Sequence, residues 1–168
     1  MTLWEINRIS SGAFTTALGG IFEHSPWVAQ CASAARPFAG IAELHDAMMA
    51  AVHGATVDMQ LALIRAHPEL AGRAAIRGEL TPDSTLEQSR AGLNQCSADE
   101  LARLTALNAA YNARFGFPFI LAVKGYDRAD VLREFARRVE CDREAEREEA
   151  LAQIAQITRS RLDALLAE

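Results

Sequence analysis

The sequence predicts an all-α protein, a single-domain multi-helix bundle of about eight helices formed by residues 1–168. Alanine, leucine and charged residues that favour helices dominate the composition, while apolar residues alternating at period two, which are typical of half-buried strands, are nearly absent. A chain of this length is most simply one domain, and it buries roughly 70% of the surface that its unfolded form exposes.

Capping patterns and apolar stripes justify each helix in turn. In the first part of the chain, a short first helix is expected from the capping box of Thr2 and Glu5, and further helices are expected over residues 13–18, 27–35, 41–54 and 56–66. Ser25-Pro26 is expected to open the third of these as an N-cap followed by proline at the first helical position. In the second part, helices are expected over residues 84–93, from Ser97 to a glycine cap at Gly116, and over 129–138 and 143–167.

His67 is the first candidate for chemistry. Pro68 lacks a backbone donor and disfavours the α conformation in the residue before it, so His67 is expected at a helix end with an extended backbone. Histidine changes its charge nearest neutral pH, which suits it to proton transfer. The alternative from these residues alone is a solvated loop histidine beside a helix stop.

Ser84 and Glu87 are the second candidates. Their spacing is that of a capping box, which by itself would explain both residues. A carboxylate held rigidly at a helix N-terminus could also orient a polar substrate, and the Ser84 hydroxyl could serve the cap, a ligand or both.

Arg161 falls on the same stripe as Ile154, Ile157 and Leu165, so its guanidinium is expected among core residues. A buried arginine needs an anionic or multi-acceptor partner, and Asp163 lies on a different helix face. An anion-binding role and a salt bridge to a distant carboxylate, or snorkelling at the edge of the stripe, explain the pattern equally well.

The segment Phe117–Val123 is apolar on every side and interrupts the helical period, so it is expected to be buried. Its backbone N–H and C=O groups then need partners, which a ligand rich in heteroatoms could supply. A short helix or strand that satisfies its own groups is the default alternative. Arg137-Arg138 and the run from Asp142 to Glu149 are charge-dense, and that run is expected to lie on a solvated helix face.

Composition and missing motifs exclude several classes of function. A formal net charge of −5 argues against nucleic-acid and anionic-membrane partners, and no apolar run is long enough for a membrane span. The N-terminus lacks a signal-peptide pattern, and three widely spaced cysteines suggest neither disulfides nor a zinc site, so a cytoplasmic location is expected. The histidines lack metal-ligand spacing, and nucleotide-binding and serine-hydrolase motifs are absent, so no metal or cofactor is expected.

Three blocks of the sequence together resemble one known family. The blocks are HPELAGR at 67–73, SxxEQxxAGL at 84–93 and FGFPFILAVKG at 115–125. In their order and spacing they are similar to the 2-oxo-4-hydroxy-4-carboxy-5-ureidoimidazoline (OHCU) decarboxylases of urate breakdown. The resemblance implies a cofactor-free, all-helical, homodimeric carboxy-lyase that converts the small molecule OHCU to (S)-allantoin with stereospecific protonation.

The resemblance also implies roles for individual residues. The family's catalytic histidine, acidic residue and arginine fall on His67, Glu87 and Arg161. Its substrate-binding positions fall on Pro68, Ser84, Phe119, Ile120, Leu121, Ala122 and Val123. Two other functions stay open: a non-catalytic helical ligand-binding or dimerisation module, and a metal-dependent amidohydrolase acting on ureides, for which the ligand set is poor.

Overall fold

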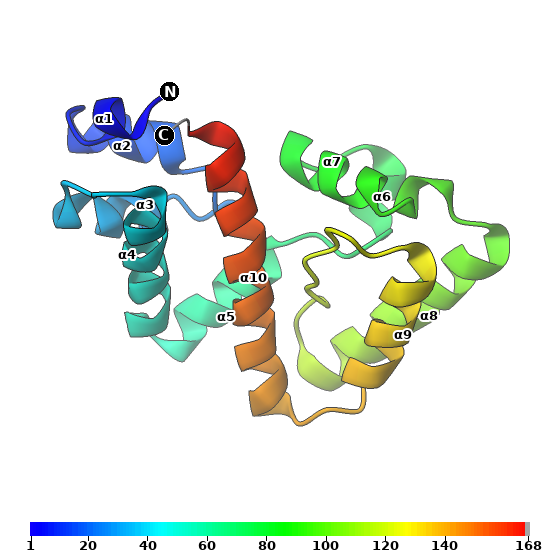
Figure 1. Cartoon of the computed structure of the whole chain (residues 1–168). Helices are drawn as coiled ribbons and strands as arrows, with labels where there is room; N and C mark the ends of the chain where they lie inside the picture. Colours follow the sequence, from blue (N-terminus) through cyan, green and yellow to red (C-terminus); the bar gives the residue numbers. More distant parts are fainter. Residues whose placement is uncertain (167–168) are drawn as a thin grey trace. The chain divides into compact units, whose positions relative to one another are not determined.

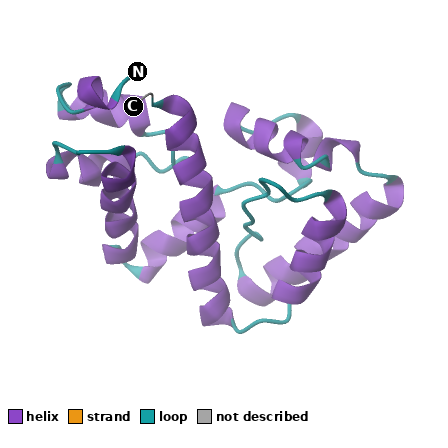
Figure 2. Cartoon of the chain, viewed as in Figure 1, coloured by secondary structure: helices purple, strands orange, loops and turns teal. Residues whose placement is uncertain are grey.

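The computed structural model describes residues 1–166, apart from the side chains of Arg73 and Ala74. Within this range all regular structure is helical, as predicted: ten α-helices and two short 3-10 helices joined by loops (Figure 2). Two of the α-helices, α1 and α6, have four and five residues, so the number exceeds the eight expected. No helix among the described residues is long and apolar enough to cross a lipid bilayer.

The chain divides into two compact units. The first unit consists of residues 1–66 and the chain from Ile154 onward, and the second consists of residues 67–153. The last helix, α10 (Arg143–Leu165), contributes residues to both. The prediction of one domain over residues 1–168 stays a prediction.

The first unit contains the N-terminal helices, which are coloured blue to cyan in Figure 1. They are α1 (Leu3–Ile6), α2 (Ser11–Leu18), α3 (Trp27–Ala32) followed by the 3-10 helix η1 (Ser33–Ala35), α4 (Ile41–Gly54) and α5 (Val57–Ala66). The predicted capping box of α1 is confirmed, because the Thr2 N–H donates to Glu5 and the Glu5 N–H donates to the Thr2 hydroxyl. Thr56 caps α5 with its hydroxyl, which accepts the Met59 N–H.

Apolar residues three or four positions apart form the core of the first unit. α3 packs against α2 and α4, and the fully buried side chains include Phe14, Leu18, Val28, Leu44, Met48 and Val52. The helix predicted over 27–35 is split into α3 and η1, and its N-terminus has no side-chain cap, so the prediction that Ser25 caps it is wrong. Ser25 instead contributes its backbone carbonyl, which accepts from the Val28 N–H.

The second unit contains the helices from green to orange in Figure 1. They are α6 (Arg73–Arg77), α7 (Pro82–Arg90), the 3-10 helix η2 (Leu93–Gln95), α8 (Ala98–Phe115), α9 (Arg128–Arg138) and the first part of α10. α6 was not predicted, because five residues are too few to show a helical period. The helix predicted over 84–93 begins at Pro82 and ends at Arg90, so its predicted start is wrong.

The ends of α8 agree with the sequence, but its buried face does not fully agree. Ser97 and Glu100 form the expected capping box, and Gly116 ends the helix in the left-handed conformation with φ of 76°. The residues on its buried face are Leu104, Asn108, Tyr111 and Phe115. From the sequence, an apolar stripe is expected on one side of this helix at Leu101, Leu104, Leu107, Ala110 and Tyr111, but Ala110 is exposed. The face that packs therefore carries a polar residue, Asn108, which an apolar pattern cannot reveal.

Aromatic rings form the core of the second unit. Tyr111 meets Phe117, Phe119 and Phe135 edge-on, with ring centroids 5.4–5.9 Å apart, and Phe119 stacks on Phe135 at 3.9 Å. Beside these rings lie Arg138 and Glu146, which are 0% and 1% exposed. The prediction that the run from Asp142 to Glu149 lies on a solvated helix face is therefore wrong at Glu146. Arg138 and Glu146 are buried together because each neutralises the other, with the Arg138 Nε donating to Glu146 Oε1 at 2.7 Å.

Candidate active site

His67 is the first residue after α5, as the proline at 68 requires, and only 6% of its surface is exposed. The alternative of a solvated loop histidine is therefore wrong. A buried imidazole has little contact with bulk water, so the groups packed around it govern its protonation. Pro68 beside it is half-buried.

Side-chain amides from two helices hold the loop that follows His67. On α7, Gln88 accepts the Ala71 N–H at 2.9 Å and donates to the Glu69 carbonyl at 3.3 Å. On α8, Asn108 donates to the Leu70 carbonyl at 3.0 Å, and Asn112 donates to Glu69 Oε1 at 2.6 Å. Four hydrogen bonds from three amides fix this loop, which carries the candidate imidazole.

The same loop contains two positions with special backbone requirements. Ala71 has a positive φ of 49°, which is strained for a residue with a side chain. A Cβ on Gly72 would lie 2.5 Å from the Cβ of Glu69, so only glycine fits there. The hydrogen bonds from α7 and α8 therefore stabilise the loop, and the glycine at position 72 permits its close approach to Glu69.

α7 carries Ser84 and Glu87 without using them as a capping box. Its N-cap is Thr81, whose hydroxyl accepts the Ser84 N–H, and Pro82 occupies the first turn. Ser84 is buried and Glu87 is half-buried. Glu87 and Gln88 follow Ser84 by three and four positions, so both lie on the same side of α7 as Ser84, and Gln88 holds the His67 loop.

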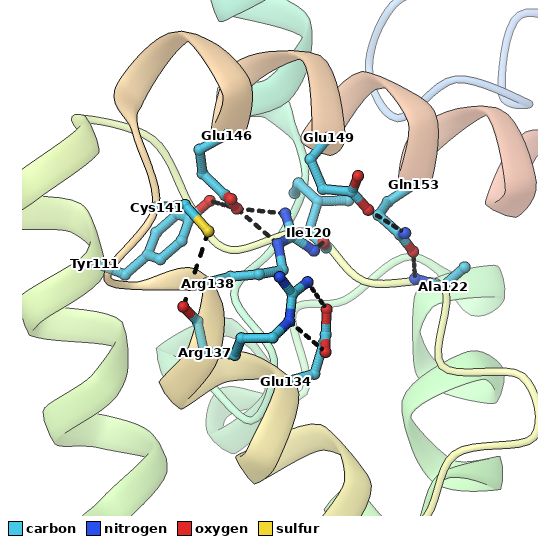
Figure 3. Close-up of polar contacts among 10 residues, drawn as sticks. All are labelled: Tyr111, Ile120, Ala122, Glu134, Arg137, Arg138, Cys141, Glu146, Glu149 and Gln153. Atoms are coloured by element: carbon cyan, nitrogen blue, oxygen red, sulfur yellow. Dashed lines mark hydrogen bonds and ion pairs between the residues drawn. The ribbon is translucent and has the colours of Figure 1, made fainter.

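The segment Phe117–Val123 is buried and has no regular secondary structure. The prediction that it is buried is confirmed, and the alternative of a short helix or strand is wrong. Two of its polar groups are bound by side chains of the same unit: the Ile120 carbonyl accepts from Arg138 at 2.7 Å, and the Ala122 N–H donates to Gln153 at 2.9 Å (Figure 3).

Arg161 lies in the first unit and is buried, as its stripe predicted, with 6% of its surface exposed. Its Nη1 lies 2.9 Å from Glu23 Oε2 and donates to the Ile21 carbonyl at 3.3 Å. The alternative of a salt bridge to a distant carboxylate is therefore observed. Glu23 is 138 positions away in the sequence, and only its place in an apolar run beside Ile21 and Phe22 could have drawn attention to it.

The candidate residues are thus distributed over both units. The first unit contains Arg161. The second unit contains the other candidates: His67, Pro68, Ser84, Glu87 and the segment Phe119–Val123. Sequence reasoning missed the residues that hold them in place: Gln88, Asn108, Asn112, Arg138, Gln153 and Glu23. Among the described residues, no group of three or more His, Cys, Asp or Glu side chains is placed to hold a metal ion.

The chain is all-helical and holds a buried histidine, the residue type most often used in enzymes that transfer protons. The family model for OHCU decarboxylase matches residues 7–163. The chain is 40% identical over 166 residues to 2-oxo-4-hydroxy-4-carboxy-5-ureidoimidazoline decarboxylase from Mus musculus, covering 99% of this chain and 93% of the mouse protein. This chain belongs to the OHCU decarboxylase family.

Two further comparisons agree with this family assignment. The chain is 39% identical over 167 residues to a uric acid degradation bifunctional protein from Bacillus subtilis (strain 168), covering 99% of this chain and 33% of that protein. A crystal structure of (S)-allantoin synthase superposes with a TM-score of 0.78 at 31% identity, covering 99% of this chain and 54% of that one. These comparisons support the fold over nearly the whole chain.

Proposed function

We propose that this protein is a carboxy-lyase that converts OHCU to (S)-allantoin in the breakdown of urate. The observation that carries the proposal is the family match over residues 7–163, because it includes His67, Glu87 and Arg161. The burial of His67 and the amides that hold its loop also support it, since proton transfer needs a fixed group.

The chemistry requires few catalytic groups. The bond between C4 and the carboxylate breaks and carbon dioxide leaves; the electron pair forms a double bond from C4 to the ureido-bearing carbon, and the C=N π pair moves to the ring nitrogen, which takes a proton from solvent. The C4 hydroxyl then loses its proton to become a carbonyl, and a proton added to the ureido-bearing carbon sets the stereocentre. We assign to His67 the exchange of a proton with the hydroxyl or with that carbon.

The other groups are proposed to bind and orient the substrate. Glu87 would accept hydrogen bonds from hydroxyl or ureido N–H groups, and Ser84 and Pro68 would contact the substrate beside it. Arg161 would donate to carbonyl oxygens on which negative charge develops. Its bonds to Glu23 and to the Ile21 carbonyl fix the orientation of the guanidinium.

The segment Phe119–Val123 is proposed to bind the planar edge of the ring through its backbone. The Ile120 carbonyl and the Ala122 N–H are bound to Arg138 and Gln153, so the substrate contacts are assigned to the other backbone groups of the segment. A fixed ring edge exposes one face to the proton donor, which would give a single enantiomer.

The experiment that tests this proposal generates OHCU from urate with urate oxidase and hydroxyisourate hydrolase. Disappearance of the ultraviolet absorbance of OHCU is then followed with and without this protein. We expect decay far faster than the spontaneous rate. Decay at the spontaneous rate would reject the decarboxylase in favour of a binding module.

Three further properties are proposed from the family. The reaction needs no cofactor, so dialysis against EDTA should leave the rate unchanged, whereas a metal-dependent amidohydrolase would lose activity. The protein is a homodimer, which light scattering after size-exclusion chromatography tests. Its location is cytoplasmic, and its free cysteines, Cys31, Cys96 and Cys141, suit a reducing compartment.

A further inference from the structure

The side chains of Arg138 and Gln153 hold the two peptide groups on either side of Leu121 (Figure 3). We infer that they are positioning residues that aim the N–H and the C=O of Leu121 at the substrate as one donor–acceptor pair. This inference rests on the proposed function, because it concerns how the segment Phe119–Val123 binds the ring of OHCU.

Arg138 fixes the first peptide group. Its Nη1 donates to the Ile120 carbonyl at 2.7 Å, and its Nε donates to Glu146 Oε1 at 2.7 Å. The guanidinium also lies over the ring of Phe119, 4.6 Å from the centroid. With none of its surface exposed, the side chain is held by an anion, a carbonyl and a ring at once.

Tyr111 completes the support of this arginine. Its hydroxyl donates to Glu146 Oε1, the same oxygen that accepts from Arg138. Burial, together with the neighbouring Glu146 carboxylate, raises the pKa of Tyr111, so the phenol keeps its proton and stays a donor. The carboxylate is therefore held from α8 and α9 and cannot turn away from Arg138.

Gln153 fixes the second peptide group. Its Oε1 accepts the Ala122 N–H at 2.9 Å, and its Nε2 donates to Glu149 Oε1 at 2.7 Å. Glu149 and Gln153 are one turn apart on α10, so the amide is oriented by its own helix. The oxygen of Gln153 consequently faces the Ala122 N–H.

Peptide planarity carries these constraints to Leu121. In a trans peptide, the C=O of one residue and the N–H of the next lie in one rigid plane and point in opposite directions. Holding the Ile120 carbonyl therefore points the Leu121 N–H away from Arg138. Holding the Ala122 N–H points the Leu121 carbonyl away from Gln153. A donor and an acceptor fixed on one residue match the N–H and C=O edge of a cyclic ureide.

The first test replaces Gln153 by methionine, which keeps the volume of the side chain and removes the acceptor. We expect kcat/KM for OHCU to fall about tenfold, the effect of losing one oriented hydrogen bond, mainly through a higher KM. The share of (S)-allantoin in the product should also fall. Gln156→Met is the matched control, since Gln156 is exposed on the same helix.

The second test replaces the buried pair together, as Arg138→Met with Glu146→Gln, which leaves no unpaired charge and keeps an acceptor for Tyr111. A similar rise in KM is expected. The control is Arg137→Met, because Arg137 forms an exposed ion pair with Glu134 on the same helix.

The outcomes separate this inference from the function on which it rests. A variant that melts earlier but keeps the wild-type KM and enantiomeric purity would show a merely structural role and overturn the inference. Equal KM values for Gln153→Met and Gln156→Met would overturn it as well. A wild-type protein that does not accelerate OHCU decay would instead reject the proposed function.

Discussion

The clearest expectation at the scale of single residues concerns His67. Replacing it by asparagine keeps a polar side chain but removes the group that exchanges protons near neutral pH. We expect kcat for OHCU to fall by about 10² to 10⁴, the usual share of general acid–base catalysis. His53→Asn is the control, because His53 is exposed in the last turn of α4. A His67→Asn enzyme with near wild-type turnover would remove His67 from proton transfer.

A second expectation concerns His45 in the first unit, which lies 3.1 Å from Thr158 Oγ1. Burial, and then the charge of Arg159, lowers the pKa of His45, although Asp46 and Asp163 oppose this shift. The unfolded chain therefore binds the proton more readily than the folded one. The stability that the neutral ring contributes is fully present above about pH 6.5 and is lost as the pH falls below that value.

The measurement is the free energy of unfolding from denaturant titrations between about pH 5 and pH 8. The wild type should lose more stability than His45→Gln as the solution is acidified. Parallel pH profiles for the two proteins would show that His45 does not titrate on unfolding.

For some single residues, the sequence was sufficient to predict where they lie in the fold, but not which residues they contact. The burial of Arg161 followed from its stripe, and the place of His67 followed from Pro68. The partners did not follow, because Glu23 is 138 positions from Arg161 and Asn108 is 38 from Leu70. Such pairs depend on how helices meet, which no local pattern encodes.

At the scale of elements, two residues near the start of α7 are expected to differ in role: Thr81 stabilises the helix and Ser84 binds the substrate. Thr81 is the N-cap, so Thr81→Ala should lower the free energy of unfolding by about 1 kcal/mol. Ser84 does not cap this helix, so Ser84→Ala should act chiefly by raising KM. Thermal unfolding and steady-state kinetics of both variants check this. A Ser84→Ala enzyme with normal KM would remove Ser84 from substrate binding.

Helix ends were predictable where one local signal stood alone. The pairs Thr2 and Glu5, and Ser97 and Glu100, were identified because each capping box lies within four residues. The start of α7 was mistaken because Thr81 and Ser84 offer two caps three residues apart. Pro82 favours the first, since proline suits the first turn of a helix.

The segment Phe117–Val123 marks the limit of prediction for elements. Its burial was evident from its composition, but its irregular backbone is sustained by Arg138 and Gln153, 18 and 31 residues further along. Default rules favoured a self-satisfied helix or strand. The segment departs from them because side chains of α9 and α10 bind its polar groups.

At the scale of the whole molecule, the all-helical class and the family could both be predicted. Composition and helical periodicity were sufficient for the class, and three sequence blocks were sufficient for the family. The division into two units was not predicted, because it follows from long-range contacts and α10 crosses it without a break. No composition shift marks that boundary in the sequence.

The most direct measurement is the enantiomeric composition of the allantoin formed when this protein acts on freshly generated OHCU, read by circular dichroism as the product accumulates. Stereospecific protonation in a fixed site predicts almost pure (S)-allantoin at a rate that scales with protein concentration. Racemic allantoin, formed no faster than without the protein, would contradict it.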